Sequence, residues 1–338
     1  MVLSYIEYVE RMKAIEKESA SNCASKKGVM KMVSKGKELV KNIKRYRVLL
    51  AMLLPTILYV IVFAYIPMGG IVLAFKNYNY NLGILESPWC GLDNFRFLFV
   101  TNKIWKLTIN TLAYNIVFIM VGLVFEVGFA IMLSEIRNQV FKKFSQAFMF
   151  LPYFISWVVV ATIMLNIFGS NGVLHHILTY FGMGDYSIYR NTKLWPFVLV
   201  LVRAWKQTGY GTVVYLAVIT GISQELYEAA SMDGATVWQK IRHITLPSLK
   251  PTIFIMVLLA LGNVFRGDFG MFYQLVGSNQ LLLDSSDIID TYIYRMLTTS
   301  PNTGMTAAAG LYQSILCFVC IMIANRVVKK VDPDYTLF

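Results

Sequence analysis

Long apolar stretches, almost free of charged side chains, recur along the chain. They cover residues 48–75, 107–134, 144–168, 194–219, 251–276 and 303–325. A helix of about 20 apolar residues crosses the roughly 30 Å hydrocarbon core of a bilayer. The pattern therefore predicts an all-α membrane protein with six transmembrane helices.

Composition agrees with this prediction. Apolar residues fill 57% of the 338 positions and charged residues only 15%, whereas roughly 25% of a soluble globular chain is charged. The net charge of +12 would suit a nucleic-acid binder, but residues 1–47 alone hold 12 Lys or Arg against five Glu. A basic segment directly before an apolar span is typical of a cytoplasmic flank near anionic lipid. We therefore expect a lipid membrane and no nucleic acid as the partner of this segment.

The distribution of Lys and Arg orients the spans. With the N-terminus inside, 21 of the 31 basic residues fall in cytoplasmic segments and seven in external loops. An excess of Lys and Arg marks the cytoplasmic side of a membrane protein. We expect a multi-pass protein of the cell membrane with both termini in the cytoplasm. Its parts are a basic tail over 1–47, a six-helix domain over 48–328 and a short tail over 329–338.

The cytoplasmic connection between the fourth and fifth spans, residues 220–250, is patterned like folded structure. Ser223 is a suitable N-cap, and Gly234 is a suitable stop for the helix that follows. Thr236 with Gln239 three residues later matches a capping box that starts a second short helix. We expect Pro247 to end that helix and to introduce the fifth span.

These two short helices have two interpretations. They could lie flat on lipid, or they could dock in a groove of a soluble partner. Helices that rest on lipid are usually rich in Lys and Arg, whereas Glu225, Glu228 and Asp233 would face anionic headgroups unfavourably. The acidic residues therefore favour docking.

The same segment carries a signature. It reads Glu228-Ala229-Ala230, then Gly234 after three residues, then Ile244-Thr245-Leu246-Pro247 after nine more. This signature resembles the EAA motif of the membrane subunits of bacterial ABC importers, and its surroundings resemble the carbohydrate-uptake branch. The resemblance implies a type I importer permease fold and a coupling helix contacted by an ATPase. The residues that it assigns to this contact are Glu228, Ala229, Ala230, Asp233, Gly234 and Pro247.

Other segments resemble the permeases for polysaccharide-derived oligosaccharides, namely residues 65–69, 74–78, 89–95 and 290–295. This resemblance implies ATP-driven import of an oligosaccharide by alternating access. It also implies three kinds of protein partner: a second permease subunit that is a distinct homologue, two ATP-binding subunits, and an extracellular sugar-binding lipoprotein.

The chain contains no Walker A sequence, the glycine-rich loop that cradles ATP phosphates. We therefore expect that it is not an enzyme and binds no cofactor, with ATP and Mg used by the partner ATPase.

Polar side chains inside a membrane are costly and usually face the bundle interior or a water-filled path. The candidates for a sugar path are Asn115, Glu126, Tyr153, Asn166, Trp205, Gln207, Tyr210, Asn263, Arg266, Asp268 and Gln313. Each of them could instead make a packing contact or an internal ion pair. Arg266 and Asp268 could neutralise each other or flank a helix break, and Lys206 is expected near an interface, where it can snorkel.

The alternative functions for such a chain are a secondary transporter or channel and a membrane enzyme. A secondary transporter or channel would show paired inverted repeats and would need no ATPase-docking signature. A membrane enzyme would need a convergent nucleophile and base within the spans, and none is found. The adjacent His175 and His176 point in divergent directions, so no metal site is expected there.

Overall fold

Contacts within the chain define two units, residues 1–70 and 71–338. The computed structural model describes residues 45–100, 103–182, 188–277, 279–299 and 302–331, so the expected tail over 1–47 lies almost entirely outside the described residues. In the first unit, α2 (Arg47–Val60) continues through the π-helical turn η1 (Ile61–Tyr65) into α3 (Ile66–Met68). The 3₁₀ helix η2 (Gly69–Phe75) follows.

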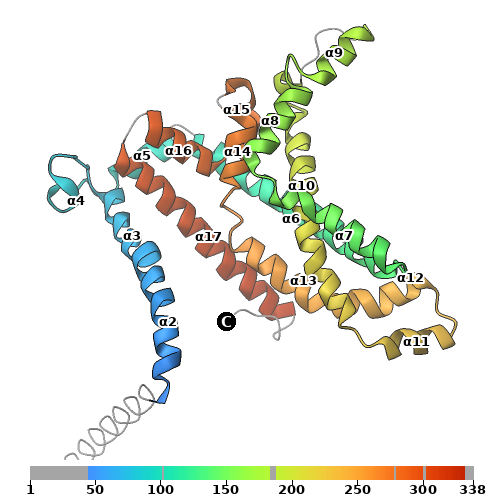
Figure 1. Cartoon of the computed structure of the whole chain (residues 1–338). Helices are drawn as coiled ribbons and strands as arrows, with labels where there is room; N and C mark the ends of the chain where they lie inside the picture. The colour runs from blue at the N-terminus through green and yellow to red at the C-terminus, as the bar shows by residue number, and fades with distance from the viewer. Residues whose placement is uncertain (1–44, 101–102, 183–187, 278, 300–301, 332–338) are drawn as a thin grey trace, which may run out of the picture. The chain divides into compact units, whose positions relative to one another are not determined.

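The second unit is built from helices joined by short turns (Figure 1). In chain order they are α4 (Gly83–Glu86), α5 (Asp93–Val100), α6 (Lys103–Glu135), α7 (Gln139–Phe154), α8 (Trp157–Phe168), α9 (Val173–Tyr180), η3 (Ile188–Arg190), α10 (Trp195–Thr220), α11 (Gln224–Met232), α12 (Val237–Lys240), η4 (Ile241–Thr245), α13 (Leu246–Leu261), α14 (Phe269–Val276), α15 (Gln280–Ser286), α16 (Ile289–Thr299) and α17 (Thr303–Val331). Within the described residues the only β pairing is an isolated bridge between Lys76 and Trp89. The all-α prediction is confirmed.

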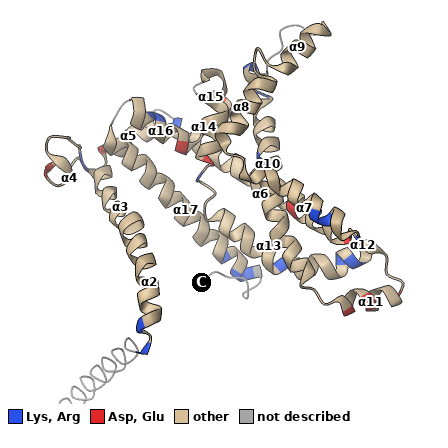
Figure 2. Ribbon diagram, viewed as in Figure 1, with Lys and Arg blue, Asp and Glu red and all other residues tan. Residues whose placement is uncertain are grey.

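Five helical segments are long and apolar enough to cross a membrane. They are Arg47–Phe75, Lys103–Glu135, Trp157–Tyr180, Val237–Leu261 and Thr303–Lys330. The predicted fourth span corresponds to α10, which carries Arg203 and Lys206 and is not among these five. The count of six spans and the cytoplasmic position of the termini therefore stay predictions. Lys and Arg gather at the start of α7, around α12 and at the end of α17 (Figure 2).

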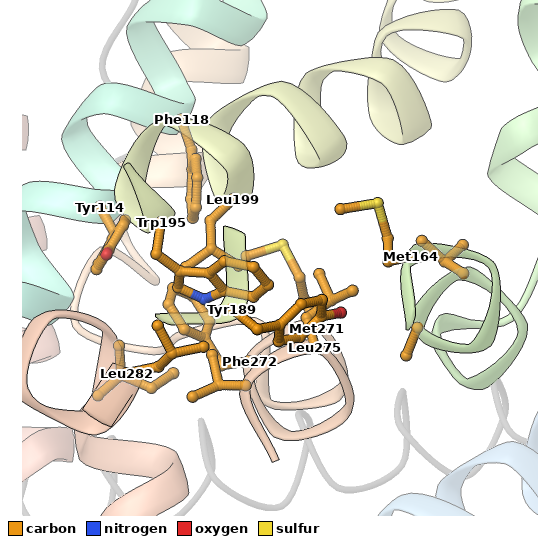
Figure 3. Packing of buried hydrophobic residues seen from close by; sticks show 14 residues of the cluster. Tyr114, Phe118, Met164, Tyr189, Trp195, Leu199, Met271, Phe272, Leu275 and Leu282 are labelled. Carbon is orange, nitrogen blue, oxygen red and sulfur yellow. The ribbon is translucent and has the colours of Figure 1, made fainter. Parts of the chain in front are cut away.

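Two buried apolar clusters hold the second unit together. In the first, Trp195 at the start of α10 packs with Tyr114 and Phe118 of α6 and Phe272 of α14 (Figure 3). In the second, α6, α10 and α13 meet through residues such as Tyr215, which is 1% exposed. Both clusters include α6 and α10, so this helix pair positions the other elements.

Two of the predicted spans are interrupted. The third, expected over 144–168, is divided at Ile155 and Ser156 between α7 and α8, and the Ser156 hydroxyl caps α8 by accepting the Val159 N–H. The fifth, expected over 251–276, ends at Leu261 and resumes only as the short α14 after a connection over 262–268. An apolar run alone does not reveal these breaks, because backbone polar groups at membrane depth can be satisfied by neighbouring helices.

The prediction that Pro247 ends a helix is wrong. The chain stays helical from Val237 to Leu261, and the π-helical turn η4 comes immediately before α13, in which Pro247 is the second residue. Pro67 has the same place after η1, as the second residue of α3. Proline lacks an N–H, and its ring clashes with a carbonyl of the preceding helical turn. A π turn is wider and relieves this clash, with hydrogen bonds between residues five apart in place of four.

The prediction that Lys206 snorkels to an interface is also wrong. Its side chain is buried, with 5% of the residue exposed. The ammonium group donates hydrogen bonds to the carbonyl oxygens of Pro152 (3.2 Å), Tyr153 (2.8 Å) and Ile155 (2.6 Å). The Pro152 carbonyl also accepts the Ile155 N–H (3.2 Å). Lys206 therefore adds donors at the carbonyl end of α7, where the last turn of a helix is short of them.

Side chains from three other helices hold the break in the fifth span. The Gln313 amide of α17 donates to the Phe265 carbonyl (2.7 Å), and the Asn115 amide of α6 donates to the Arg266 carbonyl (3.2 Å). The Asp290 carboxylate of α16 accepts the Gly267 N–H (2.7 Å) and the Gln313 amide (2.9 Å). The break is thus a defined structure rather than a loose loop.

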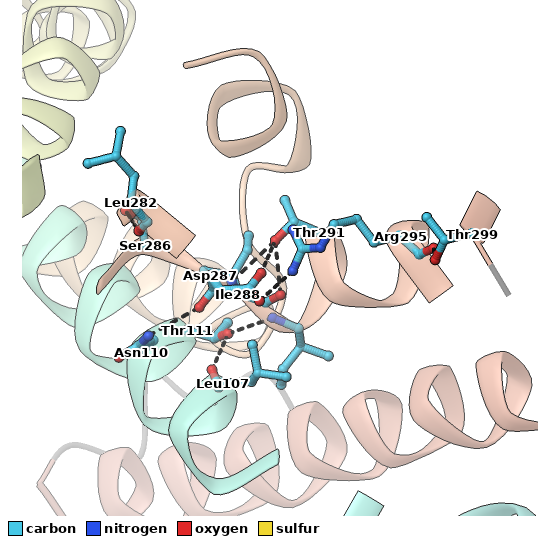
Figure 4. Close-up of polar contacts among 11 residues, drawn as sticks. Leu107, Asn110, Thr111, Leu282, Ser286, Asp287, Ile288, Thr291, Arg295 and Thr299 are labelled. Carbon is cyan, nitrogen blue, oxygen red and sulfur yellow. Dashed lines mark hydrogen bonds and ion pairs between the residues drawn. The ribbon is translucent and has the colours of Figure 1, made fainter. Parts of the chain in front are cut away.

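A second polar network ties α16 to α6 (Figure 4). The Thr111 hydroxyl accepts the Ile289 N–H (3.1 Å), and the Asn110 amide donates to the Asp287 carbonyl (3.2 Å). The carboxylate of Asp287, the C-cap residue of α15, pairs with Arg295 of α16. This network fixes the segment that presents Asp290 to the break.

Substitution of Asp290 by Ala should destabilise the chain because it leaves the Gly267 N–H without an acceptor at a half-buried position. We expect a loss of about 2 kcal/mol in the free energy of unfolding, measured as a lower Tm by scanning fluorimetry in detergent. Asp284→Ala is the matched control, since Asp284 pairs with Lys106 through largely exposed side chains and such pairs contribute less than about 1 kcal/mol. Equal Tm values for the two variants would contradict this account.

Candidate functional site

A cavity of about 330 Å³ lies between α6, α10, α13 and the break that follows α13. Its wall is largely apolar, with Phe118, Leu123 and Met256 among the lining residues. Five of the predicted path residues also line it: Asn115, Glu126, Gln207, Asn263 and Arg266. A mostly apolar cavity with a few converging polar side chains is the usual form of a small-molecule site.

Arg203 lines the same cavity, although sequence reasoning did not place it among the path residues. Its guanidinium donates to the Asp268 carboxylate (3.1 Å) and lies over the Phe118 ring, 4.6 Å from the centroid. The charge of Arg203 is thus compensated within the chain. The rule that intramembrane charges are functional candidates would have included Arg203 had it been applied to every cation in the spans.

Glu126 reaches the cavity because α10 has no side chain at position 211. A Cβ atom on Gly211 would lie 2.0 Å from the Glu126 Cδ, a distance at which the carboxylate would have to move. Two residues earlier, a Cβ atom on Gly209 would lie 2.0 Å from the Met149 carbonyl oxygen of α7. These two glycines let α6 and α7 approach α10 closely.

Arg266 differs from Arg203 in its surroundings. It is exposed at the cavity, and among the described residues no carboxylate lies within ion-pair distance of its guanidinium. Asp268, its predicted alternative partner, pairs with Arg203 and accepts the Met271 N–H as the N-cap of α14 (3.1 Å). Arg266 and Asp268 therefore flank the break and do not neutralise each other.

Three aromatic rings form a stack beside the cavity residues of α10. The Tyr153 and Tyr210 rings lie 4.8 Å apart between centroids at an interplanar angle of 14°. The Phe150 ring stacks with both, at 5.6 Å from Tyr153 and 6.3 Å from Tyr210. Tyr210 is exposed, so one end of the stack is open to a partner or a ligand.

The remaining path candidates lie elsewhere. Trp205 lines a separate apolar hollow of about 300 Å³ between α8 and α10. Asn166 is exposed on α8, and Gln313 and Asp268 are engaged in holding the break. The structure therefore gathers part of the predicted path around one cavity and assigns Gln313 and Asp268 supporting contacts.

The segment proposed for ATPase contact forms a helical hairpin at one end of the second unit (Figure 1). Ser223 occupies the N-cap position of α11, although its side chain makes no capping hydrogen bond, and the capping box of Thr236 and Gln239 is present. Gly234 has φ +77°, and the Ala235 N–H donates to the Ala230 carbonyl (2.9 Å). This is the left-handed helix stop that glycine favours.

Most of the coupling candidates present their side chains to solvent. Glu228, Ala229, Asp233, Gly234 and Pro247 are exposed, and Ala230 is half-buried.

Two side-chain contacts hold α11 against the helix that continues into α13. The Tyr227 hydroxyl bonds the Thr245 hydroxyl (2.9 Å), and the Lys240 ammonium donates to the Ser231 hydroxyl (2.7 Å). A hollow of about 350 Å³ lies between them, lined by Asp233, Gly234 and His243 among others. The hairpin thus combines a fixed base with an exposed acidic and apolar surface, on which Met232 is 88% exposed.

Solved structures share this fold. The chain superimposes with a TM-score of 0.78 on a chain of the crystal structure of a bacterial ABC transporter involved in the import of the acidic polysaccharide alginate. The two are 32% identical in sequence, and the match covers 87% of this chain and 99% of that one. A crystal structure of the bacterial alginate ABC transporter in complex with an alginate pentasaccharide-bound periplasmic protein matches with a TM-score of 0.76. The prediction of an ABC importer permease fold is confirmed.

Sequence comparison agrees. Protein LplB of Bacillus subtilis strain 168 is 33% identical over 301 residues, which cover 89% of this chain and 94% of that protein. The polygalacturonan/rhamnogalacturonan transport system permease protein YteP of the same organism is 32% identical over 303 residues, 89% and 93% of the two chains. Residues 119–333 match the family of binding-protein-dependent transport system inner membrane components. The chain belongs to this family, and it is a multi-pass membrane permease of the ABC transporter type.

Proposed function

We propose that the chain is the permease subunit of an ATP-driven importer and that α11 couples it to a separate ATPase. The observation that carries this proposal is the exposed hairpin, whose acidic helix is fixed at its base by Tyr227 and Thr245 and stopped by Gly234. Glu228 is exposed on α11 and is suited to a charge-assisted hydrogen bond with a basic group of the ATPase. Small side chains at Ala229 and Ala230 allow a partner to approach the helix closely.

The import cycle needs further subunits. The part of the chain that the structure describes holds one such hairpin, and an ATPase dimer that closes on ATP would engage two, so a second permease subunit is required. We infer a heterodimer of homologous permeases, two ATP-binding subunits and an external sugar-binding lipoprotein. Closure of the ATPase dimer would bring the two hairpins together and switch the cavity from inward-facing to outward-facing.

Charge reversal at Glu228 tests the coupling assignment. Glu228→Lys should lower uptake and sugar-stimulated ATPase activity at least about tenfold, because losing one partner of a charge pair that the docked ATPase would bury costs several kcal/mol. Gly234→Asp should lower both activities as well, because a side chain at φ +77° strains the stop of α11. Both variants should still insert in the membrane. The measurements are uptake by whole cells, ATPase activity of the purified complex and immunoblots of membranes.

The matched control is Glu86→Lys, the same charge reversal on the exposed α4, which should leave uptake unchanged. Normal uptake by both the Glu228 and the Gly234 variants would refute the role of α11.

The substrate that suits the cavity is an oligosaccharide that carries uronate groups. Asn115, Gln207 and Asn263 supply neutral hydrogen-bonding groups, and Arg266 supplies a guanidinium without an ion-pair partner among the described residues. Guanidinium binds carboxylate in a bidentate geometry. The names of two similar proteins, which refer to polygalacturonan or rhamnogalacturonan and to the acidic polysaccharide alginate, support the same class.

Replacement of Arg266 by Gln should separate acidic from neutral substrates. We expect uptake of pentagalacturonate to fall about tenfold, because a carboxylate that loses its charged partner costs roughly 1.4 kcal/mol or more. Uptake of its fully methyl-esterified form should change less than about twofold. Proteoliposomes with the complete transporter and its binding protein provide the measurement. Lys193→Gln, at an exposed position, is the control, and an equal loss for both sugars would contradict the assignment.

A further inference from the structure

Lys206 has an environment that is unusual for a lysine within a membrane domain. All three of its N–H donors are accounted for by backbone carbonyl oxygens, those of Pro152, Tyr153 and Ile155. Among the described residues, no carboxylate lies within ion-pair distance of it. Its charge is instead compensated by carbonyl dipoles and by the faces of two rings, with the ammonium 5.2 Å from the Trp157 centroid and 5.7 Å from that of Tyr153.

The carbonyl end of α7 explains why a cation is favoured there. The last turn of a helix exposes unpaired carbonyl groups and the negative end of the helix dipole. Water can satisfy these groups at the surface of a soluble protein, but not in a hydrocarbon layer. A lysine from the neighbouring α10 supplies both a positive charge and additional donors.

Lys206 and Tyr210 contact the same residue of α7 in two different ways. They are four residues apart on α10 and therefore lie on one face of that helix. Lys206 binds the Tyr153 carbonyl at 2.8 Å, and Tyr210 stacks on the Tyr153 ring at 4.8 Å. Between them, Gly209 lets the α7 backbone approach to a distance that a Cβ atom would block. Both the backbone and the ring of Tyr153 are thereby fixed relative to α10.

We propose that Lys206 is a positioning residue whose ammonium group fixes the end of α7, so that the Tyr153 ring stays aligned with Tyr210 beside the sugar path. The sugar path itself rests on the proposed function, but the alignment of the two rings does not. Since α10 leads directly to the hairpin through residues 221–223, Lys206 also makes the break between α7 and α8 follow any movement of α10. The lysine thus links the coupling helix to the aromatic stack.

The test is a cross-link that reports this alignment without any sugar. In the complete transporter, with the native cysteines replaced by Ser, Tyr153→Cys and Tyr210→Cys are joined by a short bis-methanethiosulfonate reagent in native membranes. Lys206→Met should lower the initial cross-linking rate about tenfold, since a charged hydrogen bond contributes roughly 1.5–3 kcal/mol. Lys206→Arg, which keeps the charge and the donors, should retain at least about half of the rate.

Two controls separate positioning from loss of folding. A second pair, Tyr227→Cys with Thr245→Cys, joins residues of the hairpin whose side chains are in contact, and Lys206→Met should leave its cross-linking unchanged. Lys143→Met changes an exposed lysine at the other end of α7 and should affect neither pair. An unchanged Tyr153–Tyr210 rate in Lys206→Met, or equal losses in the Met and Arg variants, would overturn the proposal.

Measurements of sugar uptake test the functional part of the proposal separately. Lys206→Met, Tyr153→Ala and their combination should lower pentagalacturonate uptake by the same factor, because two residues that act through one alignment are not additive. Additive losses would overturn the functional part of the proposal. Absence of pentagalacturonate uptake by the unaltered transporter would instead count against the proposed substrate and leave the cross-linking result intact.

Discussion

Backbone hydrogen bonding at helix ends within the membrane is the constraint on which the rest of this structure depends. Two helices that the apolar pattern predicts as continuous are broken, after Phe154 and after Leu261. A backbone group left without a partner in hydrocarbon costs several kcal/mol. Lys206 satisfies the first break, and Asn115, Gln313 and Asp290 satisfy the second. Charged and amide side chains at these depths therefore have a structural use before any role in transport.

The breaks in turn place the groups that line the cavity. The connection after α13 carries Asn263 and Arg266 to the cavity and turns Asp268 toward Arg203 of α10. The end of α7 carries Tyr153 to Tyr210. In an uninterrupted helix, each residue is rotated by about 100° from the one before it, so these side chains would point in different directions. Interruption brings Asn263 and Arg266 to the cavity between α6, α10 and α13, where α6 adds Glu126 across Gly211, and brings Tyr153 to Tyr210 of α10.

Sequence reasoning predicted the helical membrane architecture, the hairpin and its capping box, because these depend on local patterns such as apolar run length, capping residues and glycine at a left-handed position. It could not predict the roles of Lys206, Gln313 and Asp290, since these depend on which helices are neighbours. Pro247 shows the limit of a local pattern. Proline disfavours the interior of an α-helix, but here the chain stays helical because a π-helical turn precedes the proline. The division of the cavity charges between Arg203 and Arg266 likewise follows from tertiary contacts.

The polar residues within the membrane domain differ in whether a partner inside the chain accounts for them. Arg203, Lys206, Asp268 and Gln313 each have a partner within the chain that accounts for their polarity. Arg266 has no ion-pair partner among the described residues, and Glu126 occupies a space kept open by a glycine. Arg266 is exposed at the cavity, so its guanidinium is open to a partner from outside the chain. An acidic sugar or the second permease subunit would supply that partner to Arg266, and the compensated residues would hold the cavity in shape while it is exchanged.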